Sequence, residues 1–425
     1  DDTPFSDEKY TTAMVYYEDS PLVSAKYVQT LKKEQTVHVI EIASDLNLGY
    51  NLISEDAKKS GIVANFIKEK NAKTVTMSQM ATENGISQIA IERTNDLLIY
   101  SKNGARITHG GFKINYCNNV SVRNLDMDEM WQWEDTSNPK QAKIGDYDTF
   151  GWAYFKIGFS DNIWIDHCSF GKSFDGQIDV ANPYYESLGT AASAPYNADG
   201  TSDVHISWCD FHAGDSSEDG YIYKMMKKIE DEYESASGAS TNNLYYKALR
   251  DAGLSFEQIL MGIAIPQKKA FLLGDSGSEY YYNLNLNVSI ANSKFKNIED
   301  RIPKLRGGNA YMYNCIVDNF EYMSYRSQMK SIASSAVSKI NSSWKCAFTS
   351  QGIVVGNGGS VCANSCIFKG IQSLIKNNDS TIVNASGYDG ATNNGGYHLV
   401  NFTYQATESS PIISDEANVS IDCSG

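Results

Sequence analysis

One eight-residue pattern recurs along the chain and restricts its fold more than any other sequence feature. The copies are VSVRNLDM (120–127), IWIDHCSF (163–170), VHISWCDF (204–211), VSIANSKF (288–295), AYMYNCIV (310–317) and VCANSCIF (361–368). The first, third and last positions are apolar in every copy, which predicts a short strand with one buried face. Starts at 288 and 310 are 22 residues apart, the length we expect for one bare coil. Stacked coils of parallel strands form a β-solenoid.

Four cysteines occupy the sixth position of this pattern: Cys168, Cys209, Cys315 and Cys366. Parallel strands would place them in a ladder whose side chains point in the same direction rather than at each other. We therefore expect buried free thiols, with disulfides as the alternative.

Three segments interrupt the coils. Residues 20–34 begin with Ser20 and Pro21, an N-cap and first helical residue, which predicts a helix that caps one end. Residues 217–265 have helical spacing and a capping-box motif, SFEQ, so they form a helical insertion, either a lid over a cleft or a surface decoration. Residues 321–350 are expected to form a surface excursion. We expect residues 1–425 to form a single domain.

Composition limits the classes of partner that the protein can bind. The 425 residues include 51 acidic and 36 basic ones, with a net charge of −15 and a pI of 4.9. Nucleic acid and anionic membranes need a broad basic surface, so neither is expected as a partner. No apolar run approaches the roughly 20 residues of a membrane span. The composition is consistent with a secreted protein, and a targeting segment has either been removed or never existed. Our expectation, together with the resemblance described below, is a secreted monomer from which the signal peptide has been removed.

Against this acidic background, the stretch DRIPKLRGG contains Arg301, Lys304 and Arg306 around a proline. Taken alone, such a cluster is explained by a solvated loop or by ion pairs with the neighbouring Glu299 and Asp300. The other motifs described next favour a binding site for an anion.

The sequence resembles the pectate lyase family, calcium-dependent polysaccharide lyases with a right-handed parallel β-helix. The resemblance covers roughly residues 37–320, and it rests on five stretches in the family's order: VHVIEIASDLNLGYN, LLIYSKNGARITHGGFKI, NVSVRNLDM, NIWIDHCSF and DRIPKLRGGNAYMYNCIVDN. It implies an all-β fold and a secreted enzyme that cleaves α-1,4-polygalacturonate into 4,5-unsaturated oligogalacturonides.

The resemblance also implies a role for individual residues. The family motif R-x-P-x-x-R makes Arg301 the Brønsted base and Arg306 a ligand of a substrate carboxylate. Lys269, in QKKAFLLG, would hold another carboxylate, and we expect Lys304 to contact the substrate. The element DGQID gives Asp175 and Asp179 as Ca²⁺ ligands.

The proposed chemistry explains these residue types. β-Elimination removes the C5 proton, alpha to a carboxylate, and the developing negative charge must be neutralised by cations. Ca²⁺ accepts several oxygen ligands, and arginine offers a planar fork to a carboxylate. An arginine acts as a base only where neighbouring cations disfavour its charged form, which predicts an alkaline pH optimum.

The sequence departs from the family where further calcium carboxylates are expected. Gly151 and Ala153 occupy those positions, and neither side chain binds a metal. Asp148 or Asp146, slightly upstream, is a candidate replacement.

Three further explanations of this departure remain open. Asp126 and Asp128 are more remote candidates, and substrate carboxylates are an alternative source of ligands. Metal would be dispensable if the protein were a pectin lyase, which acts on methyl-esterified chains.

Other function classes give different expectations. A β-helical glycoside hydrolase needs paired carboxylates that we do not find in the corresponding coil. A non-catalytic carbohydrate-binding β-helix would use some of the 27 tyrosines to stack on sugars.

His167, in WIDH, occupies a coil position shared with Trp208, so we expect a structural role for it.

Overall fold

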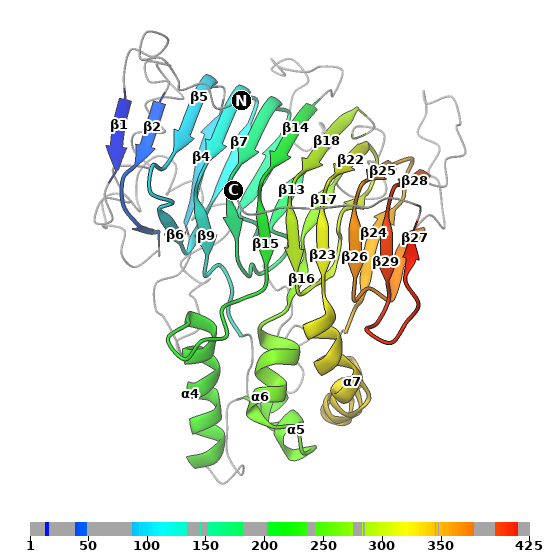
Figure 1. Cartoon of the computed structure of the whole chain (residues 1–425). Coiled ribbons are helices and arrows are strands. Elements are labelled where there is room, and N and C mark those ends of the chain that lie inside the picture. Colours follow the sequence, from blue (N-terminus) through cyan, green and yellow to red (C-terminus); the bar gives the residue numbers. More distant parts are fainter. Residues whose placement is uncertain are drawn as a thin grey trace.

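The chain folds as a parallel β-helix (Figure 1). The computed structural model describes residues 13–16, 39–48, 87–92, 94–133, 145, 152–181, 202–235, 243–274, 283, 285–344, 346, 348–377 and 396–414. Successive strands enter three sheets in turn, and almost every neighbouring pair is parallel. The predicted solenoid is therefore confirmed.

The strand bounds are as follows. Sheet 1 contains β1 (Ala13–Tyr16), β2 (Val39–Ile42), β5 (Asn95–Tyr100), β8 (Asn118–Arg123), β11 (Asp161–Asp166), β14 (Ser202–Ser207), β18 (Leu286–Ala291), β22 (Asn309–Tyr313), β25 (Ser360–Asn364) and β28 (Gly396–Val400). Sheet 2 contains β4 (Ser87–Glu92), β7 (Gly110–Asn115), β10 (Phe155–Gly158), β13 (Ile178–Val180), β17 (Phe271–Leu273), β21 (Lys304–Leu305), β24 (Gln351–Val355) and β27 (Ser373–Asn377). Sheet 3 contains β3 (Leu46–Asn47), β6 (Arg106–Thr108), β9 (Asp126–Asp128), β12 (Ser169–Phe170), β15 (Asp210–His212), β19 (Lys294–Lys296), β23 (Ile316–Asp318), β26 (Ile367–Lys369), β29 (Thr403–Gln405) and β30 (Ile413–Ser414). Strands β16 (Gln267–Lys269) and β20 (Ile298–Asp300) pair separately.

The repeated pattern sets the register of sheet 1. Its first positions align across the strands as Val120, Ile163, Val204, Val288, Ala310 and Val361. All six side chains are buried in the interior of the helix. Alternate residues point outward because successive side chains of a strand lie on opposite faces. A one-residue slip would expose this apolar row, so the register is strongly determined.

The corners between sheets 1 and 3 share one backbone conformation. The residue at each corner has a left-handed backbone, as at His167 (φ 52°), Trp208 (φ 53°) and Asn314 (φ 51°). His167 stacks on Trp208 at 6.0 Å and its Nδ1 lies 2.8 Å from the Asp166 carboxylate, which agrees with the structural role expected for it. The four cysteines of the pattern, which follow these corners, are buried free thiols.

Helices project from one side of the β-helix, at the bottom of Figure 1. The insertion contains α4 (Tyr221–Ser235), α5 (Leu244–Asp251), α6 (Phe256–Ile259) and the π-helix η6 (Leu260–Ala264), and the predicted capping box at Ser255 is present. The excursion expected at 321–350 contains α7 (Phe320–Ile340), which packs against α5 and η6. The capping helix expected at 20–34 lies outside the described residues.

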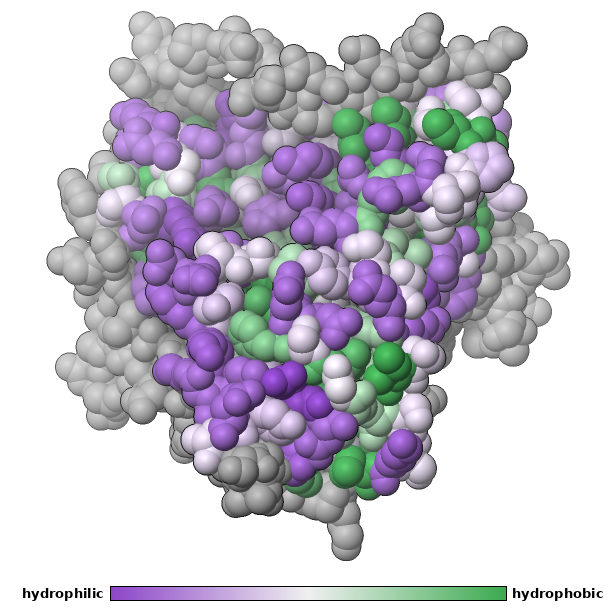
Figure 2. Space-filling model, turned by 60° about the horizontal axis from the view of Figure 1, so that its bottom comes forward, coloured by the Kyte–Doolittle hydropathy of each residue, from purple (hydrophilic) through white to green (hydrophobic). Residues whose placement is uncertain are grey.

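The helical side presents a mostly polar surface. Figure 2 shows hydrophilic residues predominating there, with hydrophobic residues in small separate groups. The apolar side chains of α4, such as Met225, Met226 and Ile229, are instead buried in the core. Among the described helices, none has the length and apolar character that a membrane span requires.

Candidate active site

A row of side chains that includes four lysines and one aspartate crosses sheet 2. The register aligns Lys113, Lys156, Asp179, Leu272, Lys304, Val354 and Lys376 on successive strands. Their neighbours along the strands, such as Ile178, Val180 and Leu305, are buried, so the row faces outward. At about 4.8 Å per strand, the row is about 29 Å long. Four lysines therefore lie on one face of a chain with a net charge of −15.

Asp175 lies beside this row and forms ion pairs with two basic side chains. The Nζ of Lys269 is 2.6 Å from Asp175 Oδ1, and Nη1 of Arg301 is 3.9 Å from the same oxygen. Their side chains are largely buried, with exposed fractions of 16% for Lys269, 19% for Asp175 and 11% for Arg301. Residues from three coils thus meet around one carboxylate.

Gln267 holds Asp175 and Lys269 in place through hydrogen bonds to the backbone. Its fully buried amide accepts from Ser173 N and donates to Asp175 O (2.9 Å) and Lys269 O (2.7 Å). One side chain thereby connects the turn that carries Asp175 to the strand that carries Lys269. Only Pro266 separates Gln267 from the insertion, so the insertion ends next to the site.

The backbone presents Arg301 at a sharp turn between β20 and β21. Arg301 has a left-handed backbone (φ 63°), its N–H donates to Asp300 Oδ1 at 2.7 Å, and its carbonyl accepts from Phe271 N at 2.8 Å. Its Nε is buried and has no hydrogen-bond partner among the described residues. Such a backbone conformation is uncommon for a residue with a side chain and is often found at functional sites.

Asp179 is the second carboxylate of the site. Its Oδ1 is buried without a hydrogen-bond partner in the described part of the chain. A Cβ at residue 176 would lie 2.9 Å from that oxygen, so the glycine of DGQID leaves room for Asp179. Burial and the neighbouring Asp175 raise the pKa of Asp179 to about 6. A buried carboxylate without a partner is a natural place for a cation.

The charged neighbours of Asp175 and Lys304 shift the pKa values of both groups. Burial would raise the pKa of Asp175, but Lys269, Arg301 and Lys156 together outweigh burial, and the pKa is lowered. Burial, together with Arg301 and Arg306, lowers the pKa of Lys304 to about 8. The positive charges therefore repel one another, and an anion placed among them would be stabilised.

The structure brings most of the predicted site residues together. Asp175, Asp179, Lys269, Arg301 and Lys304 lie on or beside the outer face of sheet 2. Arg306 follows β21 directly, and its N–H donates to Leu273 O at 2.7 Å. Asp148, Asp146 and Gly151 lie outside the described residues. Ala153 is buried and contributes no oxygen ligand from its side chain.

The more remote calcium candidates belong to a different cluster. Asp126 and Asp128 lie on β9 in sheet 3, where Arg106 approaches them at 3.6 and 2.6 Å. In the described part of the chain, no three acidic, histidine or cysteine side chains form a group that could hold a metal ion.

Several residues of the site carry no sequence motif. Gln267 was not predicted, because a glutamine after a proline has no characteristic pattern. Lys113, Lys156 and Lys376 are recognised only through the register of sheet 2.

Comparisons with known proteins identify the family. The chain is 33% identical to pectate lyase B of Paenibacillus amylolyticus over 342 residues, which is 80% of this chain and 78% of the relative. A shorter match of 90 residues, 21% of this chain and 22% of the relative, is 33% identical to the pectate trisaccharide-lyase of Thermotoga maritima. A solved pectate lyase (pelN) from Paenibacillus sp. 0602 superposes with a TM-score of 0.75 at 28% identity, and the match covers 98% of this chain and 82% of that one. No family model matches the sequence.

The parallel β-helix and these matches define the class of the chain, the polysaccharide lyases. The extent and identity of the first match place the chain more closely: it belongs to the pectate lyase family. It is therefore an enzyme, a polysaccharide lyase.

Proposed function

We propose that the protein is a secreted, monomeric enzyme that cleaves polygalacturonate by β-elimination on the outer face of sheet 2. The observation that carries this proposal is the meeting of Asp175 and Asp179 with Lys269, Arg301 and Lys304 on a lysine-lined face. A polyanion is attracted to such a face although the whole chain is acidic. The row of lysines would extend binding over several sugar units.

Arg301 is the base in this proposal. The C5 proton moves to the guanidine, the electron pair forms the C4=C5 bond, and the C4–O bond breaks with the leaving sugar carrying the oxygen away. A base must be within hydrogen-bond reach of its proton, and Arg301 lies within the cluster that would hold the substrate, with its Nη1 3.9 Å from Asp175 Oδ1.

Lys269, Lys304 and Arg306 hold substrate carboxylates. Lys269 is paired with Asp175 at 2.6 Å, so a substrate carboxylate would compete with Asp175 for the ammonium. Lys304, whose pKa is about 8, is charged at neutral pH and gains a counter-ion when the substrate binds. Arg306 offers a planar fork to a second carboxylate.

Ca²⁺ fits the two carboxylates but not a complete protein site. Asp179 Oδ1 has no partner in the described chain, and Asp175 is close enough to raise the pKa of Asp179. Asp175 and Asp179 would hold the ion, and Asp148 is a candidate for a further ligand. When bound, Ca²⁺ supplies positive charge next to the substrate carboxylate.

The nature of the products tests the reaction class. Mass spectrometry of a polygalacturonate digest should show oligomers whose new non-reducing ends lack one water, because elimination adds no water. Products that have all gained one water per cleavage would identify a hydrolase and refute the proposal. Full activity in excess chelator would refute the calcium part alone, and a preference for methyl-esterified chains would favour a pectin lyase.

A further inference from the structure

A second, chemically different surface lies on the outer face of sheet 1. The register aligns six outward side chains on successive strands: Trp164, His205, Ser289, Tyr311, Cys362 and His398. Five strand spacings of about 4.8 Å give this row a length of about 24 Å. We call the surface from β14 to β28, together with Trp164 on β11, the aromatic face.

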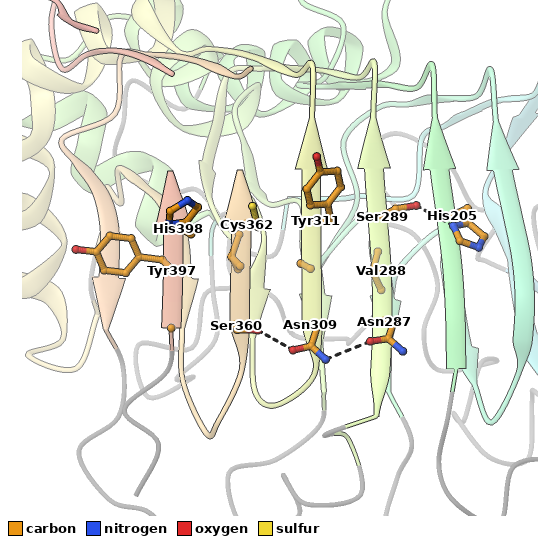
Figure 3. A pocket seen from close by; sticks show the side chains of 13 residues that line it. His205, Asn287, Val288, Ser289, Asn309, Tyr311, Ser360, Cys362, Tyr397 and His398 are labelled. Carbon is orange, nitrogen blue, oxygen red and sulfur yellow. Dashed lines mark hydrogen bonds between the residues drawn. The ribbon is translucent and has the colours of Figure 1, made fainter. Parts of the chain in front are cut away.

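The aromatic face contains a groove of about 530 Å³. Figure 3 shows Tyr311, Cys362 and His398 on one side of it and Asn287, Asn309 and Ser360 on the other. The groove lies on a different sheet from Asp175 and Arg301, so it is separate from the candidate active site.

Exposed aromatic rings are concentrated on this face. Trp164 is 42% exposed, Tyr311 43% and Tyr313 44%. The rings of Tyr311 and Tyr313 are parallel within 7° at 6.4 Å, and Trp164 lies 4.5 Å from the ring of His205. Large exposed aromatic side chains gathered in one place are typical of binding surfaces rather than of inert ones.

A ladder of neutral polar side chains runs beside the rings. Asn287 donates to Asp203 at 3.0 Å, Asn309 donates to Asn287 at 3.1 Å, and Ser360 donates to Asn309 at 2.6 Å. These bonds hold the amides in a fixed orientation. The amide nitrogen of Asn309 carries two hydrogens and donates one of them to Asn287, so donor capacity remains at this edge of the groove.

The charge of the face determines the class of ligand. Strands β14, β18, β22, β25 and β28 contain no lysine or arginine, and their one acidic residue is Asp203. Arg123, on β8 near the edge of the face, is paired with Asp166 at 2.9 Å. A polyuronate would find no free cation in these five strands, whereas sheet 2 offers it four lysines. Aromatic rings beside fixed amides suit the apolar faces and hydroxyl edges of neutral sugars.

We infer that the aromatic face binds a neutral polysaccharide chain along the row from Trp164 to His398. The enzyme thus has two sugar-binding surfaces of different charge: sheet 2 for an acidic polymer and sheet 1 for an uncharged one. The inference does not depend on the role of Arg301, because the residues and the ligand are different.

Affinity electrophoresis tests this inference in gels that contain xyloglucan, galactan, arabinan or hydroxyethyl cellulose, each in turn. The wild-type chain should be retarded by at least one of these polymers. The double substitution Tyr311→Ala and Tyr313→Ala should weaken that binding by about tenfold or more, as expected when aromatic anchors are removed. Tyr311→Phe, which keeps the ring, should bind like the wild type.

The control is Ile332→Ala, a hydrophobic residue of α7 that is 42% exposed. It should leave binding unchanged, and equal thermal midpoints would show that all variants are folded. No retardation of the wild type by any neutral polymer would overturn the inference, as would equal retardation of the double variant. Binding at this face to polygalacturonate alone, or a dimer that the double variant loses, would also overturn it.

Discussion

Asp179 should make the folded protein less stable at neutral pH when no cation is bound. Burial and Asp175 raise its pKa from 3.8 to about 6. The folded state therefore binds a proton more readily than the unfolded state between about pH 4 and 6, and stability falls as the pH rises through this window. Above about pH 6 the full cost applies, at most about 3 kcal/mol for a shift of about two pKa units.

The substitution Asp179→Asn tests this reasoning. In chelator at pH 8, urea unfolding should show the variant to be more stable than the wild type by up to about 3 kcal/mol, and the difference should vanish below about pH 4. Added Ca²⁺ should stabilise the wild type but not the variant, because a cation that binds the folded state alone shifts the unfolding equilibrium. Asp219→Asn, at a fully exposed carboxylate of the same charge, is the control and should change neither property.

A less stable Asp179→Asn in chelator would refute the electrostatic account of this carboxylate. Equal stabilisation of both proteins by Ca²⁺ would show that the ion binds elsewhere. The two results are independent, so the stability argument and the calcium proposal can fail separately.

Three further predictions concern the same face. Gln267→Leu should remove the connection between the Asp175 turn and β16; we expect kcat to fall about tenfold or more, with a smaller change in KM, in steady-state kinetics. Because the pKa of Lys304 is about 8, the ammonium is lost above that pH; KM for polygalacturonate should rise there in the wild type, and Lys304→Arg, which stays charged, should remove the rise. If Lys376 and Lys113 bind the ends of a long substrate, Lys376→Ala should raise KM severalfold for long oligomers and leave it unchanged for the shortest cleavable ones; equal effects on both would contradict the extended binding row.

The fold could be predicted from the periodicity of the sequence, because burying one face of each strand requires an apolar residue at every second position. Val120 and its five counterparts alternate with residues that point outward, and their alignment in sheet 1 follows from keeping that apolar row inside. Sheet 2 has no comparable repeat, since its strands are as short as Lys304–Leu305. The lysine row was therefore not visible in the sequence, although each lysine was.

Sequence motifs identified the charged residues at the centre of the site but not the residues that hold them in position. The family pattern pointed to Arg301 and Asp175, which the structure brings within 3.9 Å of each other. Lys269 follows a long insertion, so its position beside Asp175 depends on how β16 pairs with β20. Gln267 acts through backbone groups of distant residues, and such contacts leave no pattern in the sequence. A further calcium ligand, for which Asp148 is the candidate, lies outside the described residues.

The most direct test of the account is the ultraviolet absorbance of the C4=C5 product during incubation with polygalacturonate. Wild-type protein and Arg123→Lys, a control whose arginine pairs with Asp166 on sheet 1, should both generate the absorbance. Arg301→Lys should reduce kcat by about a hundredfold or more, because the base is lost while the positive charge is kept. If Arg301→Lys generates the product at a rate close to that of the wild type, Arg301 is not the base, and the central claim is wrong.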